Sequence, residues 1–328
     1  GPKRVFMFGD YVQRVLKETL RGRGMGGLLE YGEHDSTRLT LSTLFGLLFL
    51  TTSAFLYWDV YSLVESSAST FHSPWASLEF LILWRFTCFL AGASAVFHMF
   101  KTGRGIMIVI QHDERKETTL HPVGFEKFVT FSSWTLLLNI LYFFIAGILS
   151  LNVMNGNQSP SWLNAMLVVV FSAALGASLL TATVVRYIIL PGEVRIKRNH
   201  DQMFNFPNQM MHNFSAIFLI IEIILVQPEL SPSFAFFGLI LGTLYALFAY
   251  LFAFYGGGFY VYSFLDPRLR YGPLWMTGIA GAIAFFYLGV WCCIQLMAYN
   301  FLIGATVLLI WLSLIIQFRT GLTEPIVN

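Results

Sequence analysis

The chain has 328 residues and a formal net charge of +2, and 56% of its residues are hydrophobic while only 12% are charged. Soluble domains carry about 25% charged residues, so the chain lacks the side chains that would cover a water-soluble fold of this size. The small net charge, with no run of Lys and Arg interleaved with aromatic residues, also excludes a nucleic-acid-binding protein. Lipid is the solvent that remains, and in lipid only helices and closed barrels satisfy their backbone hydrogen bonds.

Residues 1–40 form a basic segment that precedes the first long apolar run. Its basic residues are Lys3, Arg4, Arg14, Lys17, Arg21, Arg23 and Arg38, and acidic residues are interspersed among them. Residues 5–20 fit a basic amphipathic helix that lies on the membrane surface. A solvated tail fits the same composition, so both interpretations stay open.

Long apolar segments account for most of the remaining chain. They cover residues 41–63, 80–100, 128–150, 162–190, 210–227, 234–255, 273–297 and 299–318. Each is long enough to cross a hydrocarbon core of about 30 Å as a helix, and the fifth is the shortest. The runs are continuous rather than alternating, which favours helices over a barrel. The sequence therefore predicts an all-α, polytopic transmembrane bundle with about eight spans.

The basic residues between these segments follow a regular alternation. The loops after the second, fourth and sixth segments contain Lys or Arg, whereas the loops after the first, third, fifth and seventh contain none. Cytosolic loops of membrane proteins are enriched in Lys and Arg. The alternation therefore predicts that both termini are cytosolic, with a transmembrane domain at 41–318 and a short cytosolic tail at 319–328.

Charged residues fall inside the predicted spans, where an unpaired charge is costly. Arg85 lies near the lumenal side of the second span, and Glu79 and Asp59 at similar depth are its expected partners. Glu222 lies near the middle of the fifth span. We expect its carboxyl group to be protonated or paired and to face the interior of the bundle.

Thr130 and His212 lie at matching depth, about one turn inside the cytosolic boundary of the third and fifth spans. Both are expected at helix N-termini, where unpaired N–H groups can stabilise an oxyanion and keep an imidazole neutral. A hydroxyl nucleophile needs such a base. The spacing permits a catalytic Thr–His pair, and a helix N-cap is the alternative interpretation of Thr130.

Motifs around these residues resemble those of the androgen-induced-gene family of multi-pass membrane hydrolases, which includes the androgen-dependent regulator of tissue-factor-pathway inhibitor. The resemblance covers roughly residues 80–297. It rests on Asn208-Gln-Met-Met-His212, on Glu222, and on the run Gly258-Phe-Tyr-Val-Tyr-Ser-Phe-Leu-Asp266, with Val129-Thr130-Phe131 and Trp162 as weaker matches. Where the family has His and Gly, this chain has Gln209 and Met210, and Ser263 and Asp266 replace Pro and Glu.

The resemblance implies a hydrolase that cleaves fatty acid esters of hydroxy fatty acids or similar lipids. Thr130 would be the nucleophile and His212 its base, and neither a cofactor nor a metal is expected. We expect Glu222, Asn208 and Arg85 to be polar residues of the pocket or of the structure. The expected location is the endoplasmic reticulum or another endomembrane, with membrane lipids and a lipid ester as partners.

Two segments, 41–63 and 299–318, have no obvious counterpart in the animal members of that family, and they could dock protein partners. The alternative function is therefore a non-catalytic subunit of a larger membrane complex that retains the fold. A transporter is a third possibility, because Arg85, Glu222 and Asp59 could line a path across the membrane. It is less favoured because the sequence contains no internal repeat.

Overall fold

The computed structural model describes residues 29–102, 105, 107–195 and 201–319. The predicted surface helix at 5–20 and the tail beyond residue 319 lie outside the described residues. The helices are α2 (Thr37–Tyr57), α3 (Val60–Ala68), α4 (Leu78–Lys101), α5 (Phe131–Met154), α6 (Ser161–Val184), α7 (Leu190–Arg195), α8 (Phe206–Gln209), α9 (Ser215–Val226), α10 (Ala235–Phe252), α11 (Gly272–Tyr299) and α12 (Phe301–Ile315). The strands are β1 (Met107–Gln111), β2 (Glu117–Leu120) and β3 (Phe259–Tyr260).

Within the described residues, seven helices are long and apolar enough to cross a membrane. They match the first seven predicted spans, and the protein is an integral, multi-pass membrane protein with an all-α bundle. π-Helical segments extend three of these spans, at Val185–Ile189 after α6, at Met210–Phe214 between α8 and α9, and at Ala253–Gly257 after α10. Such segments are rare and are often found at functional sites.

The eighth predicted segment forms a shorter helix than expected. α12 has 15 residues, or about 22 Å at 1.5 Å per residue, which is less than a full hydrocarbon core. Its end is fixed by side chains that follow α6. Arg186 donates to the carbonyls of Ser313, at 3.0 Å, and Ile316, and the Tyr187 hydroxyl donates to the Leu314 carbonyl at 2.5 Å. Because these carbonyls are satisfied from outside, the helix can stop at Ile315.

Polar side chains define where the spans begin. Ser77, Thr130 and Asn300 each accept a hydrogen bond from a backbone N–H in the first turn of α4, α5 and α12, respectively. Asn205 does the same for α8, so the fifth span begins at Phe206 rather than at residue 210. These side chains satisfy N–H groups that have no intrahelical acceptor.

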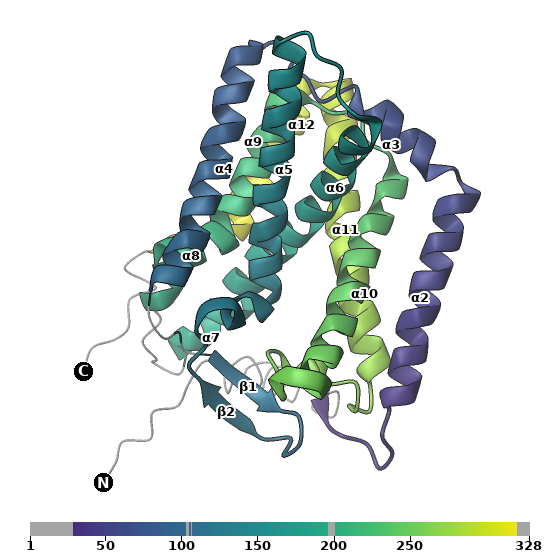
Figure 1. Ribbon diagram of the computed structural model, residues 1–328, viewed down its shortest axis with the longest axis vertical. Helices are drawn as coiled ribbons and strands as arrows, with labels where there is room; N and C mark the ends of the chain where they lie inside the picture. The colour runs from purple at the N-terminus through teal and green to yellow at the C-terminus, as the bar shows by residue number, and fades with distance from the viewer. Residues whose placement is uncertain (1–28, 103–104, 106, 196–200, 320–328) are drawn as a thin grey trace.

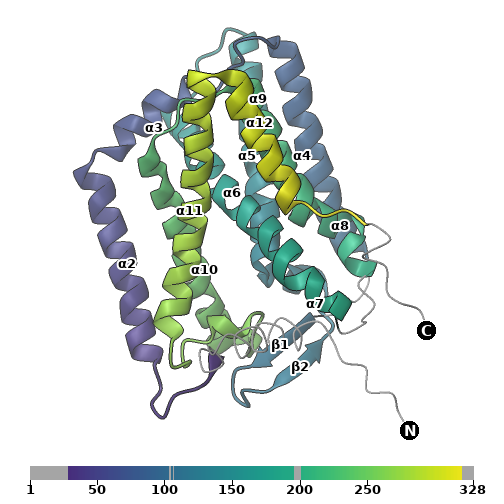
Figure 2. The ribbon, with the colours of Figure 1, turned by 180° about the vertical axis from the view of Figure 1, so that it is seen from behind.

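The connections after α4, α6 and α10 lie at one end of the bundle, which we call the basic end (Figure 1). α2 packs against α10 and α11 on one side of the molecule, while α4, α5 and α9 lie on the other (Figures 1 and 2). A small antiparallel sheet in the order β2-β1-β3 covers the basic end. The pairing of Ile110 with Tyr260 joins the β1–β2 hairpin to the 258–266 run.

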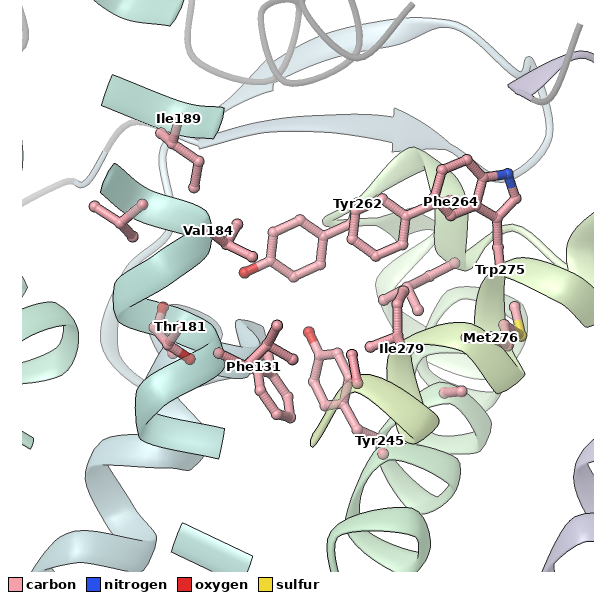
Figure 3. Close-up of a pocket in the computed structure, with 18 of the residues that line it drawn as sticks. Phe131, Thr181, Val184, Ile189, Tyr245, Tyr262, Phe264, Trp275, Met276 and Ile279 are labelled. Atoms are coloured by element: carbon pink, nitrogen blue, oxygen red, sulfur yellow. The ribbon is translucent and has the colours of Figure 1, made fainter. Parts of the chain in front are cut away.

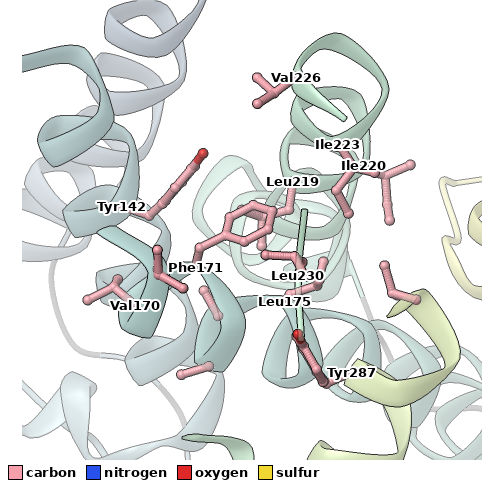
Figure 4. Close-up of a cluster of buried hydrophobic side chains, with 14 of the residues drawn as sticks. Tyr142, Val170, Phe171, Leu175, Leu219, Ile220, Ile223, Val226, Leu230 and Tyr287 are labelled. Carbon is pink, nitrogen blue, oxygen red and sulfur yellow. The ribbon is translucent and has the colours of Figure 1, made fainter. Parts of the chain in front are cut away.

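The largest apolar cluster fills the centre of the bundle, where Phe171, Leu175 and Leu219 are fully buried between α5, α6, α9 and α11 (Figure 4). Close helix contacts depend on small residues. Gly238 and Gly242 of α10 face Ala280 and Ala284 of α11, and a Cβ at Gly242 would lie 2.6 Å from the Ala280 Cα. This small-xxx-small pairing lets the two backbones approach.

Candidate functional site

A cavity of about 430 Å³ lies near the basic end of the bundle. Its walls come from the start of α5, the end of α6, α10, α11 and the 258–266 run (Figure 3). Most of its lining is apolar, with Phe264, Trp275 and Ile279 along one side. Leu274 and Gly278, on α11, are exposed at its edge. α11 is one of the helices that are long and apolar enough to cross a membrane, so this edge of the cavity lies on a candidate membrane span.

A few polar residues belong to this lining. They are Ser132, Thr181, His212, Tyr245 and Tyr262. The hydroxyl groups of the two tyrosines point toward the same region, beside Thr181 of α6 (Figure 3). Tyr245 donates to the carbonyl of Val129, just before α5, at 2.9 Å. This part of the lining therefore lies beside the N-terminus of α5.

Tyr262 is held beside that N-terminus. Burial raises the pKa of Tyr262 to about 12, and hydrogen bonding with the Phe131 backbone and the Ser132 side chain opposes this rise. At neutral pH the phenol is consequently protonated. Its hydroxyl can donate a hydrogen bond to a ligand in the cavity.

His212 borders the cavity from the π-helical segment between α8 and α9. Its Nδ1 is buried and has no hydrogen-bond partner among the described residues. The expectation that His212 lies at a helix N-terminus is wrong, because the helix already begins at Phe206 and is capped by Asn205. An imidazole in the wall of the cavity is a base of the kind that an ester hydrolase needs.

Thr130 is the N-cap of α5, so the alternative interpretation of this residue is confirmed as its structural role. Its Oγ1 accepts from the Ser133 backbone N–H at 3.2 Å and lies 2.7 Å from the Ser133 Oγ. It also lies 3.3 Å from the Ser132 Oγ. Ser132, and not Thr130, borders the cavity. The Thr130 hydroxyl is therefore separated from the cavity by the Ser132 side chain.

The structure brings the segments of Thr130 and His212 together without joining the two side chains. The Ser133 Oγ lies 3.6 Å from the Met211 Sδ, so the start of α5 packs against the π-helical segment. No hydrogen bond between Thr130 and His212 is present in the part of the chain that the structure describes. A Thr130–His212 reaction would require the threonine side chain to leave its capping contacts.

Arg85 and Glu222 form a buried ion pair, with 2.7 Å between an Arg85 terminal nitrogen and a Glu222 Oε1. Glu222 also accepts hydrogen bonds from the indole of Trp84 and the hydroxyl of Tyr142, both at 2.9 Å. The other Arg85 hydrogen bonds go to the Phe71 and Ala146 carbonyls and to the Ser150 hydroxyl. Every charged atom of the pair is thus satisfied, which indicates a structural role.

The prediction that Glu79 or Asp59 pairs with Arg85 is therefore wrong. Glu79 is exposed in the first turn of α4, and the Asp59 carboxylate bonds to Ser62 between α2 and α3. Glu222 lies ten residues after His212, about 15 Å further along the helix, and does not border the cavity. Asn208 is also outside the cavity, since its side chain donates to the Gln202 carbonyl at 2.6 Å.

Ser132, Thr181, Tyr245 and Tyr262 were missed as site residues by the sequence analysis. Two signals could have pointed to them. Tyr262 belongs to the 258–266 run, and Ser132 is two residues after Thr130. Among the described residues, no group of three or more His, Cys, Asp or Glu side chains could hold a metal ion.

Comparisons of the chain with protein-family models, with curated proteins and with solved structures found no match. The candidate site is therefore defined by its own geometry: an apolar cavity whose lining includes an imidazole and several hydroxyl-bearing residues.

Proposed function

We propose that the protein hydrolyses membrane lipid esters, such as fatty acid esters of hydroxy fatty acids, in the cavity. The observation that carries this proposal is His212, an imidazole with an unpartnered, buried Nδ1 in the wall of an apolar cavity. An ester hydrolase needs a base next to a hydroxyl nucleophile, and apolar walls suit acyl chains. The enzyme would act in the endoplasmic reticulum or another endomembrane.

In this proposal a hydroxyl oxygen at the start of α5 attacks the acyl carbonyl carbon, and its proton passes to His212. The bond between the acyl carbon and the alcohol oxygen breaks, and His212 returns the proton to the leaving alkoxide. Water, deprotonated by His212, then attacks the acyl carbon. The bond between that carbon and the nucleophile oxygen breaks, His212 returns the proton to this oxygen, and the fatty acid is released. The Ser133 N–H, which would be released when the Thr130 side chain leaves its capping position, would stabilise both oxyanions.

Two residues compete for the role of nucleophile. The resemblance to the androgen-induced-gene family implies Thr130. The cavity favours Ser132, because its side chain borders the cavity and lies 3.3 Å from the Thr130 Oγ1. We propose Thr130 as the nucleophile. The experiment must distinguish it from Ser132, the alternative nucleophile.

Labelling of the purified protein with a lipid-like fluorophosphonate probe tests the proposal. His212→Ala is expected to slow labelling by about 100-fold or more, as is usual when a general base is removed. Thr130→Asn is the matched change at the nucleophile, because asparagine keeps an N-cap acceptor but lacks the hydroxyl. Loss of labelling in this variant, at unchanged thermal stability, separates catalysis from capping.

Ser132→Ala assigns the nucleophile in the same experiment. Labelling that survives in Thr130→Asn and disappears in Ser132→Ala would transfer the role to Ser132. A folded wild-type protein that takes up no probe would contradict a hydrolase with either residue.

A substitution at Gly278 tests whether the lipid substrate enters the cavity from the membrane. A Cβ at Gly278 meets no atom within 4 Å, so leucine is accommodated there while its side chain extends over the edge of the cavity. Gly278→Leu is expected to slow probe labelling roughly 10-fold or more, as extra carbon atoms do in a fitted pocket. Gly281→Leu is the control, because it lies in equally open space on α11 but does not border the cavity. Equal labelling rates for the two variants would contradict access at this edge.

A non-catalytic lipid-binding subunit is the second candidate function. The capping role of Thr130 favours it, because that hydroxyl is already engaged with Ser133. The exposed aromatic residues of α2, such as Phe45 and Phe49, would then contact lipid or a partner protein. This candidate predicts a folded protein that binds lipid in the cavity without reacting with the probe.

A further inference from the structure

The deep end of the cavity lies where α6, α10 and α11 converge. The lining residues furthest from the basic end on these helices are Leu180, Gly242 and Ala282. Beyond them lies Ile283, which is fully buried. A Cβ at Gly238 would lie 3.0 Å from the Ile283 Cγ2, and a Cβ at Gly176 would lie 2.4 Å from the Ile283 carbonyl oxygen. Contacts this close leave no passage between the helices, so the cavity is a blind pocket with Ile283 as its floor.

Nearer the basic end, the cavity has its exposed edge on α11, at Leu274 and Gly278. Ala282 lies eight residues after Leu274, about 12 Å further along the helix. A straight chain that enters at this edge therefore meets the floor at a fixed depth. The pocket can bind only a limited length of such a chain.

The wall between the edge and the floor is apolar. Val184, Phe264 and Ile279 line it (Figure 3), and among the described residues no Asp, Glu, Lys or Arg borders the cavity. At about 30 Å³ per water-sized group, a volume of about 430 Å³ holds on the order of 14 carbon atoms with their hydrogens. This is enough for one hydrocarbon chain but not for two.

Two hydroxyl groups lie within a turn of the deep end, and both already have protein partners. Tyr245 donates to the Val129 carbonyl at 2.9 Å. The Thr181 Oγ1 lies 3.4 Å from the Thr135 Oγ1. A hydroxyl group at the end of a bound chain would therefore find its potential partners engaged, and an unpaired polar group is unfavourable in apolar surroundings. A plain hydrocarbon chain avoids this penalty.

We propose that the cavity is a length-selective pocket for one unsubstituted hydrocarbon chain of a neutral lipid, with Ile283 as its floor and Ala282 as the residue that sets the preferred length. The identity of the ligand rests on the proposed function, because in a hydrolase the bound chain is the acyl chain of the ester. The substrates are then lipid esters with a straight acyl chain of about 14 carbons. The alcohol part of the ester, including that of a hydroxy fatty acid, stays outside the pocket.

Fluorescence quenching on the full chain in mixed micelles tests the pocket. Trp275 lines the cavity, so bound dibrominated methyl myristate is expected to quench its emission, and Trp275→Phe identifies the part of the signal that comes from this residue. Saturated methyl esters from laurate to arachidate then compete with the brominated probe. For the wild-type protein we expect the highest affinity near methyl myristate. Methyl stearate, whose chain is longer than the pocket, is expected to bind about 10-fold more weakly.

Substitutions at Ala282 test what sets the length. Ala282→Leu adds bulk at the deep end, so it is expected to weaken binding of methyl myristate about 10-fold and to shift the preference to methyl laurate. Ala282→Gly removes a methyl group and is expected to improve binding of methyl palmitate relative to methyl myristate. Gly281→Leu is the control, because it adds a side chain on α11 that does not border the cavity. All variants are measured in the same micelles, so differences in how the esters partition cancel.

A methyl myristate with a hydroxyl group near the end of its chain tests the wall. It is expected to bind the wild-type protein about 10-fold more weakly than methyl myristate itself. Equal affinity for the two esters, no quenching of the wild-type protein, or one length preference shared by the wild type and both Ala282 variants would overturn the proposal.

The outcome is separable from that of the hydrolase proposal. Length-selective binding by a protein that never reacts with the fluorophosphonate probe supports the pocket and contradicts the hydrolase. Probe labelling without length-selective binding supports the hydrolase and overturns the pocket.

Discussion

Glu222→Ala is expected to destabilise the folded protein by about 3–5 kcal/mol, because removal of one partner leaves a buried charge uncompensated. The Arg85 side chain is almost fully buried and would lose the Glu222 carboxylate. The Trp84 indole and the Tyr142 hydroxyl would lose their acceptor as well. Equilibrium unfolding in mixed micelles, followed by circular dichroism, measures the effect.

A double variant distinguishes charge burial from loss of packing. Arg85→Met combined with Glu222→Leu removes both charges and keeps side-chain volume, so it is expected to recover a large part of the loss seen in Glu222→Ala. Tyr142→Phe added to this pair removes a hydroxyl that would otherwise be buried without a partner. The exposed Glu79 provides the control, since Glu79→Ala removes a carboxylate that touches no buried cation. A Glu222→Ala protein as stable as the Glu79→Ala protein would contradict the structural role of the ion pair.

The pairing of Arg85 with Glu222 shows why the spans were predictable and their contacts were not. Apolar runs long enough to cross a membrane are a property of the local sequence, and seven of them became long helices. Which side chains meet depends on the rotation of each helix about its own axis. Glu79 and Asp59 were the nearer candidates in depth, but neither faces Arg85. The partner comes from α9, 137 residues away in the chain.

The same reason explains the outcome at the start of α5. Residues two apart on a helix point in different directions, so the motif could place Thr130 and Ser132 at the right level without showing which one borders the cavity. Thr130 caps the helix, and Ser132 borders the cavity. The length of α12 could not be predicted from its own sequence either, because Arg186 and Tyr187, after α6, fix its end. The Thr130–His212 reaction stays a prediction.

Gly176→Ala is expected to destabilise the protein by about 2–3 kcal/mol, although alanine favours a helix over glycine by about 1 kcal/mol. α6 crosses α11 at this residue, and a Cβ at Gly176 would lie 2.4 Å from the backbone carbonyl oxygen of Ile283. A carbonyl oxygen cannot rotate away as a side chain does. The two helices must therefore separate, and their separation would also widen the cavity one turn further along α6. Thermal unfolding and probe labelling of the same sample measure both effects.

Gly289→Ala is the matched control, because the same substitution there meets a side chain instead of backbone. Its Cβ would lie 2.7 Å from the tip of the Trp311 ring on α12. The ring can shift by a small rotation about its side-chain bonds, so we expect a change in stability within about 1 kcal/mol, the size of the helix-propensity gain. Truncation of the Ile283 side chain should not rescue Gly176→Ala, since the clash is with the carbonyl. Equal stability of the two glycine variants, or rescue by Ile283→Ala, would show that α6 and α11 do not pack backbone to backbone at Gly176.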